Sequence, residues 1–202
     1  VNNKEVIKEI FKSTKLVISV HCEDESIIRK NLNHFLAIYG QNIPFKLHPQ
    51  IRSSEACYKS SSEAINLAIE TGARLHVFHI STENEIKLFS EKPLEEKQIT
   101  SEVCTHHLWF SDKDYSIKGS RIKWNPAIKT EADRNALWEA LNADKIDVYA
   151  TDHAPHTLNE KKLPYTQSPS GGPLVQHGLL AMLDSVKNNK ITLEKFVEKA
   201  SH

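Results

Sequence analysis

The chain reads KLVISVHCED over residues 15–24, where a short apolar run rich in β-branched residues ends in a histidine, a cysteine and two acids. A run of this length and composition is typical of a strand that is buried on both faces of a parallel sheet. The helical pattern that follows over residues 25–39 stops near Gly40, a residue type that commonly ends helices. The two segments together form one strand-then-helix unit.

Similar units recur along the chain. Further strands are predicted at residues 74–80 (RLHVFHI), 99–103 and 145–151 (KIDVYAT). Further helices are predicted at residues 54–71, from Glu83 onward, and at 130–142, 174–188 and 192–200. Loops are expected between them, namely a long one through Trp109 and Trp124 and a polar one over 158–173. Strands that alternate with helices indicate βαβ units and a parallel sheet.

The number of these units bears on the architecture. Four parallel strands leave two open sheet edges, whereas a closed (β/α)8 barrel takes about 250 residues. The chain has 202 residues, begins with Val1 and holds a single methionine, Met182, so we expect it to be a piece of a larger protein. The predicted fold is therefore α/β, the second half of such a barrel. An open doubly wound sheet is the alternative, although no glycine-rich nucleotide-binding motif follows a predicted strand.

The charge balance argues against two classes of partner. The chain carries 26 basic and 26 acidic residues, while nucleic acids and membrane surfaces select a basic excess. Its apolar runs are short beside the ~20 residues that a membrane-spanning helix needs. Three cysteines without a C-x-x-C spacing, and a start without a signal-peptide pattern, indicate free thiols in a reducing compartment. We therefore expect a cytoplasmic protein that binds neither nucleic acid nor membrane.

Three chemically reactive side chains follow three of the predicted strands. His21 follows LVISV, His79 follows RLHVF and Asp152 follows DVYAT. The carboxyl ends of parallel barrel strands meet at one mouth, where active sites are built. Two imidazoles and a carboxylate at that mouth suit a divalent metal ion, above all zinc. An ordinary structural role stays open, because strand ends also favour polar residues.

Other polar residues lie close to these three in the sequence. Asp152 begins the cluster DHAPH, and its carboxylate could bind a metal ion and also move a proton from metal-bound water. His156 lies further on, in the loop where a substrate would be reached. His153 is expected to support the site rather than to bind a metal ion. His106 and His107 are expected to be structural, because adjacent residues of an extended chain point in opposite directions.

Two loop segments have both a functional and an ordinary interpretation. Asn125, which precedes Pro126, could offer a donor and an acceptor to a polar substrate, or could simply belong to a turn. The segment SPSGGP over residues 168–173 could bring backbone N–H groups close to a ligand, or could be a plain mobile loop. His76 has the opposite strand parity to His79 and is expected to face the helices.

Five motifs, taken in order, resemble those of a known family. They are HCED (21–24), HIST (79–82), EVCTHHL (102–108), KWNPAIKT (123–130) and ATDHAPHT (150–157). Together they resemble dihydroorotase, a member of the amidohydrolase superfamily of metal-dependent (β/α)8 barrels. HCED and HIST alone are also similar to motifs of allantoinases, hydantoinases and dihydropyrimidinases. The resemblance spans nearly the whole chain, and it implies strands 5–8, the C-terminal half of the barrel.

The resemblance also implies roles for single residues. His21 and His79 would bind the more buried of two zinc ions, and Asp152 would bind the other and act as catalytic acid and base. Asn125 and His156 would contact the dihydroorotate ring, with the backbone near Gly171 assisting. The implied reaction is the reversible, zinc-dependent hydrolysis of the cyclic amide of dihydroorotate to N-carbamoyl-aspartate in pyrimidine synthesis. A homodimer is expected as the assembly.

Parts of the family pattern are missing from the chain. The H-x-H pair with its nearby arginine, and the bridging carboxylated lysine or aspartate, are absent and would precede Val1. We therefore expect residues 1–202 to form one partial barrel domain that lacks strands 1–4, binds zinc weakly and is inactive alone. Two alternatives stay open, namely another cyclic amidohydrolase and a catalytically silent dihydroorotase-like scaffold subunit.

Overall fold

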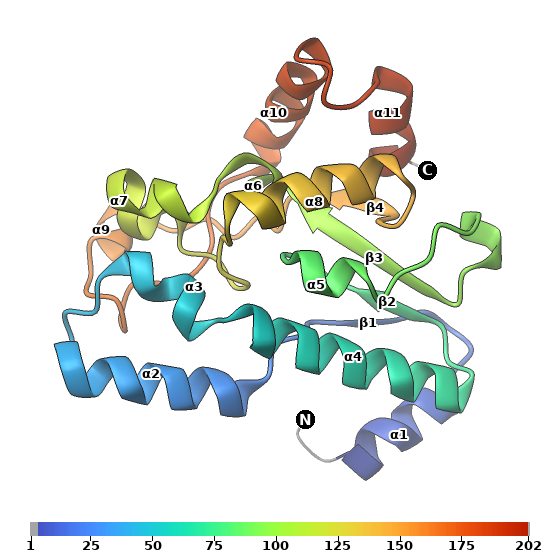
Figure 1. The fold of residues 1–202 in the computed structure, drawn as a ribbon, viewed down its shortest axis with the longest axis horizontal. Helices are drawn as coiled ribbons and strands as arrows, with labels where there is room; N and C mark the ends of the chain where they lie inside the picture. Colours follow the sequence, from blue (N-terminus) through green and yellow to red (C-terminus); the bar gives the residue numbers. More distant parts are fainter. Residues whose placement is uncertain (1–3, 202) are drawn as a thin grey trace.

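The computed structural model describes residues 4–201 and contains one parallel sheet (Figure 1). Its strands are β1 (Ile18–Val20), β2 (Leu75–Val77), β3 (Ile99–Cys104) and β4 (Val148–Ala150). The strands lie side by side in the order of the sequence, so each connection crosses over to the next neighbour. This is the arrangement that the repeated units predict, and it places the carboxyl ends of all strands at one edge.

Helices fill the connections between the strands. The long ones are α1 (Lys4–Ser13), α2 (Glu25–Tyr39), α4 (Ser54–Thr71), α8 (Glu131–Asn142), α10 (Val175–Lys187) and α11 (Leu193–Ser201). The short ones are α3 (His48–Ile51), α5 (Glu83–Ile86), α6 (Thr105–Trp109), α7 (Tyr115–Lys118) and α9 (Leu158–Lys161). In Figure 1, α1 lies next to α4, while α10 and α11 lie together beyond β4.

Most predicted helices begin and end within one residue of their expected positions, because local caps set them. The Asp24 side chain accepts the N–H groups of Ser26 and Ile27 at the start of α2. Gly40, with φ of 56°, ends the same helix in a conformation that suits glycine. Thr130 and Asp133 form a reciprocal capping box at the start of α8. These signals lie within a few residues, so the sequence alone contains them.

Other expectations need correction. The strands β1, β2 and β4 are shorter than the apolar runs suggest, whereas β3 continues one residue further than expected. Ile80 and Ile146 lie beyond the paired residues and are fully buried, and the Ile80 N–H still donates to the Glu102 carbonyl of β3 at 2.8 Å. The expected long loop through Trp109 and Trp124 contains α6 and α7, and the polar loop begins with α9. The sequence pattern did not predict α1 at all, although this helix packs against α4.

The main core lies between one face of the sheet and the helices. Leu75 and Val77 of β2 and Val103 of β3 are buried there together with Leu137 and Leu141 of α8. These strand residues alternate with polar ones, as the side chains of a strand must alternate between its faces. One face of the sheet is thus apolar and covered by helices.

The opposite face of the sheet carries polar side chains where β2 pairs with β3. The His76 imidazole lies there, with Nδ1 2.9 Å from the Thr100 hydroxyl and Nε2 3.2 Å from the Glu102 carboxylate. The expectation that His76 faces the helices was therefore wrong, since its neighbours Leu75 and Val77 occupy that layer. The parity argument assumed an extended chain through His79, but β2 ends at Val77 and His79 has φ of 40°, so strand alternation does not relate the two side chains.

Within residues 4–201, every helix is too short or too polar to cross a bilayer. The cysteines Cys22, Cys57 and Cys104 are all buried free thiols, as expected from their spacing.

We predict that Leu141→Ala lowers the free energy of unfolding by about 2–5 kcal/mol, because the side chain is fully buried between α8 and the sheet. Urea unfolding of the protein that carries this chain measures the loss. Asn135→Ala, at an exposed position of the same helix, should change that free energy by less than about 0.5 kcal/mol. Equal effects of the two changes would contradict the assigned core.

Candidate active site

His21 and His79 meet at the carboxyl ends of β1 and β2. The register pairs Val20 with Val77, so His21 directly follows one strand and His79 comes two residues after the other. Nδ1 of His21 lies 2.6 Å from Nε2 of His79, and the ring centroids are 4.8 Å apart. The structure therefore brings together the two histidines that the sequence singled out from segments 58 residues apart.

The protonation of His79 suits metal binding. Its side chain is only 4% exposed. Burial, and then the neighbouring His21 imidazole, lower the pKa of His79 to about 3. At neutral pH the His79 ring is therefore uncharged, which is the form that binds metal ions.

Two of the predicted site residues have an unusual backbone conformation. His79 has φ of 40° and Asp152 has φ of 45°, so both lie in the left-handed region that non-glycine residues rarely adopt. Such conformations cost on the order of 1–3 kcal/mol and persist only where the surrounding structure imposes them. Both residues lie just beyond strand ends, at the edge where the carboxyl ends of the strands gather.

Asp152 lies near this histidine pair but does not complete a cluster with it. Burial raises the pKa of its carboxyl, the His21 ring acts in the opposite direction, and Glu102 raises the pKa further. Across residues 4–201, no group of three or more His, Cys, Asp or Glu side chains is placed to hold a metal ion. The joint role of His21, His79 and Asp152 as metal ligands thus stays a prediction.

A buried carboxylate holds the turn that carries His79. Glu85 is 2% exposed, and its Oε2 accepts the Thr82 hydroxyl at 2.9 Å and the Ser81 N–H at 3.3 Å. Its Oε1 accepts the Ser61 hydroxyl of α4 at 2.8 Å. The Thr82 hydroxyl oxygen in turn accepts the Glu85 N–H as the N-cap of α5, so Glu85 joins the turn after His79 to a neighbouring helix.

The predicted substrate contacts form a second group. Asn125 Oδ1 accepts the Ser170 hydroxyl at 2.9 Å, and His156 Nε2 donates to the Ser170 carbonyl at 3.0 Å. The two side chains, expected from different motifs, are therefore linked through one residue of the SPSGGP segment. Their contact with a ligand stays a prediction.

Gly171 makes a close approach that only glycine allows. Its φ is 125°, and a Cβ atom at this position would lie 2.6 Å from the Cβ of Ala154. Its N–H donates to the Lys123 carbonyl at 2.8 Å and its own carbonyl accepts the Lys161 ammonium at 2.8 Å. In this structure the Gly171 backbone holds the loop together, and its expected part in binding a substrate stays a prediction.

Three further histidines, His153, His106 and His107, contact other parts of the chain. His153 Nδ1 accepts the N–H groups of Leu174 and Val175 at the start of α10, each at 3.0 Å, which agrees with its expected supporting role. His106 and His107 are buried in α6, not in an extended segment, so the geometric reason for excluding them was wrong. His107 Nε2 donates to the Pro126 carbonyl, and His106 stacks on Trp124 at 4.4 Å.

Sequence reasoning missed several buried polar residues near the site. His48 received no role, yet its Nε2 donates to the Trp124 carbonyl at 2.7 Å and its Nδ1 accepts the Tyr165 hydroxyl at 2.6 Å. Lys123 and Lys161 lie in segments that the sequence predicts to be loops, yet the two residues are only 8% and 6% exposed. Nothing in the local sequence marks these residues, because their partners lie far along the chain.

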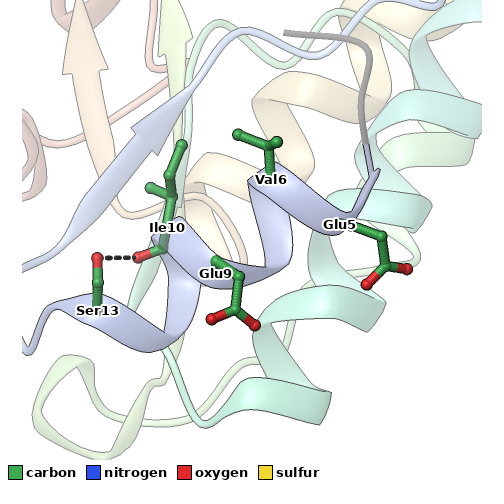
Figure 2. Close-up of a pocket in the computed structure, with 5 residues that line it drawn as sticks. All are labelled: Glu5, Val6, Glu9, Ile10 and Ser13. Atoms are coloured by element: carbon green, nitrogen blue, oxygen red, sulfur yellow. Dashed lines mark hydrogen bonds between the residues drawn. The ribbon is translucent and has the colours of Figure 1, made fainter.

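A surface hollow on another part of the chain is a second candidate site. It lies along α1 and is lined by Glu5, Val6, Glu9, Ile10 and Ser13 (Figure 2). All of these residues belong to a single helix, and the hydrogen bond drawn there joins the Ser13 hydroxyl to the Ile10 carbonyl. The hollow therefore lacks the convergence of several strand ends that positions His21 and His79.

Comparison with known proteins places this arrangement in a family. No protein-family model matches the chain. A dihydroorotase of Listeria monocytogenes is 32% identical over 184 residues, which is 91% of this chain. A dihydroorotase of Latilactobacillus sakei is 36% identical over 155 residues, or 76% of this chain. The chain belongs to the dihydroorotase family.

The solved structures agree with this family. The L-hydantoinase (dihydropyrimidinase) of Arthrobacter aurescens superimposes with a TM-score of 0.87 at 25% identity and covers 95% of this chain. The four-stranded sheet thus corresponds to part of an amidohydrolase (β/α)8 barrel. The chain spans 42% and 35% of the length of the two dihydroorotases and 44% of the hydantoinase.

We predict that Gly171→Ala destabilises the protein more than Gly40→Ala does. Both glycines have positive φ, but a Cβ at Gly40 meets nothing within 4 Å, whereas one at Gly171 would collide with Ala154. Urea unfolding should show a loss of about 1 kcal/mol for Gly40→Ala from backbone strain, and about 1–3 kcal/mol more for Gly171→Ala. Equal losses would show that the loop around Gly171 moves to make room for the methyl group without a further loss of stability.

Proposed function

We propose that this chain contributes part of the active site of a zinc-dependent dihydroorotase, which hydrolyses the cyclic amide of dihydroorotate reversibly to N-carbamoyl-aspartate. The observation that carries the proposal is the contact of His21 with His79 at adjacent strand ends, on a chain of this family. Chance placement of polar residues at strand ends does not explain why the two ring nitrogens face each other.

The residues present fit zinc. Imidazole nitrogen and carboxylate oxygen are donors that zinc takes in hydrolytic sites, and burial keeps the His79 ring neutral. We assign His21 and His79 to one zinc ion and Asp152 to a second. A zinc site needs about four ligands, so these three cannot complete two sites.

Asp152 is proposed to move the proton of the reaction. When bound, zinc lowers the pKa of water from ~15.7 towards ~7 and polarises the amide carbonyl. The Asp152 carboxylate would accept the proton of the attacking water and deliver it to the leaving nitrogen. Its position beyond β4, half-buried and in a left-handed conformation, holds the carboxylate at the strand-end edge.

Asn125 and His156 are proposed to hold the substrate ring. Their shared partner Ser170 keeps both side chains on one loop surface. An amide offers a donor and an acceptor, which match the N–H and C=O groups of a cyclic amide. Gly171 would bring the backbone of the loop close to the ring because it carries no side chain.

We predict that Asp152→Asn lowers turnover of dihydroorotate at least about 100-fold in the protein at the length of its relatives, since the amide cannot accept the proton. Spectrophotometry of ring opening and closure measures the rate. Asp184→Asn, at an exposed position of α10, serves as the control and should leave the rate unchanged. Near-normal turnover of the Asp152 variant would refute the proton-transfer role.

The metal assignment makes a separate prediction. His79→Ala should lower the zinc content of the same protein, because a ligand of one ion is lost. Metal analysis of the dialysed protein gives the number of zinc ions per chain. His34→Ala, an exposed histidine of α2, should keep the full content. Unchanged zinc in the His79 variant would remove this residue from the ligand set.

Residues 1–202 alone are expected to show no turnover and to bind zinc weakly, because they supply fewer ligands than two closed zinc sites require. Measurable conversion of dihydroorotate by the purified 202-residue chain would contradict this expectation. The expected homodimer and the cytoplasmic location also stay predictions, and sedimentation of the complete protein tests the first.

Competing substrates separate this proposal from its alternatives. The hydantoinase likeness concerns the fold, whereas the relatives at 32–36% identity are named dihydroorotases. The complete protein should therefore prefer dihydroorotate over hydantoin, allantoin and dihydrouracil in parallel assays. Preference for a neutral ring would favour another cyclic amidohydrolase. Full folding with neither metal nor turnover would favour a silent scaffold subunit.

A further inference from the structure

Two lysine ammonium groups are buried beneath the loop that carries Ser170 and Gly171. Lys123 is 8% exposed and Lys161 is 6% exposed, although lysines are almost never buried to this extent without a partner. Lys123 precedes the Trp124–Asn125 segment, and Lys161 ends α9. The partners that compensate their burial are backbone carbonyl groups.

Lys123 holds the first part of the loop. Its Nζ donates to the carbonyls of Tyr165 at 2.8 Å and Ser168 at 2.6 Å. The same ammonium lies 4.5 Å from the centroid of the Tyr165 ring, a cation–π arrangement. Its own carbonyl accepts the Gly171 N–H, so one residue holds both ends of the loop.

Lys161 holds the second part of the loop. Its Nζ donates to the carbonyls of Pro169 at 2.9 Å and Gly171 at 2.8 Å, and lies 3.4 Å from that of Lys123. The Lys161 carbonyl in turn accepts the Ser120 hydroxyl. Through these contacts the ammonium spans the two sides of the glycine-containing turn.

Carbonyl dipoles, not carboxylates, surround these charges. Burial lowers the pKa of both lysines to about 8. Among the described residues, the positive charges of Lys161 and Arg52 lower the pKa of Lys123 further. Hydrogen bonds from a charged donor are roughly twice as strong as neutral ones. The loop is thus folded around two cations, much as carbonyl groups fold around a metal ion.

The loop held in this way is the one that organises the predicted substrate contacts. Ser170 lies between Pro169 and Gly171, both bound by Lys161, and it is bonded to Asn125 and His156. Among residues 4–201, the other backbone hydrogen bonds of this loop lie near its ends. Gln167 and Ser168 both donate to the Pro164 carbonyl, and the Gly172 carbonyl accepts the Ala154 N–H at 3.2 Å. The conformation at Ser170 therefore depends on the two ammonium groups.

We propose that Lys123 and Lys161 are positioning residues, whose ammonium groups bind the carbonyls of residues 165–171 and so place Ser170, Asn125 and His156 for binding the substrate ring. The inference rests on the proposed function for the identity of the ligand. The placement of the loop itself rests only on the contacts above. Neither lysine touches the reacting atoms, so their removal affects binding more than the chemical step.

Lys161→Ala in the protein at the length of its relatives tests this role. We expect KM for dihydroorotate to rise about tenfold or more while kcat changes less than about threefold, the pattern of lost uniform binding. Lys162→Ala is the matched control, because the Lys162 side chain is next in the sequence and is exposed. This variant should change neither KM nor kcat. A loss confined to kcat would overturn the proposal.

Chemical rescue separates positioning by the ammonium from general structural damage. Propylammonium replaces the atoms that Lys161→Ala removes beyond Cβ, and adding it should restore KM; propanol, which is of similar shape but uncharged, should not. Failure of the amine to restore KM would overturn the proposal. If the alanine variant does not fold, Lys161→Met keeps the apolar stem and takes its place in the measurements of KM and kcat.

Hydrogen exchange decides the loop role even if dihydroorotate is not the substrate. Without the Lys161 ammonium, the Gly171 amide should exchange at least about tenfold faster, because the loop opens more often, while amides of α8 stay unchanged. Unchanged exchange at Gly171 would refute the positioning role whatever the substrate. Faster exchange in a protein that does not convert dihydroorotate would instead refute the proposed function alone.

Discussion

Parallel pairing of β1 with β2 in the Val20–Val77 register is the constraint on which the site depends. Because both strands run in the same direction, their carboxyl ends lie side by side, and His21 and His79 emerge at neighbouring points. The 2.6 Å approach of their nitrogens follows from this register together with the left-handed turn at His79. A slip by one residue would turn His21 towards the other face of the sheet.

Burial on the helix side of the sheet stabilises that register. The residues that alternate with the polar face of β2 and β3, namely Leu75, Val77 and Val103, are completely enclosed between the strands and helices such as α8. On the other face, the His76 imidazole of β2 is hydrogen-bonded to Thr100 and Glu102 of β3. The proposed metal ligands lie at the end of this sheet, beyond the last paired residues, where the backbone no longer has to stay extended.

The loops beyond the strands are held by hydrogen bonds with side chains other than the proposed metal ligands. Glu85 anchors the turn after His79, and His153 anchors the start of α10. Gly171 allows the 168–173 segment to lie against Ala154, and the lysine ammonium groups bind its carbonyls. Active-site loops that are fixed in this way lose little entropy on binding a ligand, which is the physical value of such supports.

Local signals in the sequence predicted the α/β class, most of the long helices and the polar residues at the strand ends. These signals are helix caps, hydrophobic periodicity and the order of the motifs. Helix α2, for example, begins at the Asp24 cap and ends at Gly40 as the pattern predicts. The sequence also pointed to His21 and His79, since each directly follows an apolar run. The family resemblance rested on the same segments, and the identity to dihydroorotases confirmed it.

Three features became visible only in the folded chain, namely the face of β2 that carries His76, the points where the strands stop pairing, and the burial of Lys123, Lys161 and His48. A lysine in a polar segment is expected to be exposed to solvent. Lys123 is instead buried against carbonyl groups of a distant loop, among them that of Tyr165, 42 residues further along the chain. Such partnerships join distant segments, and no periodicity or local composition records them. Local signals determine elements, whereas the compensation of buried charge is settled only when the chain has folded.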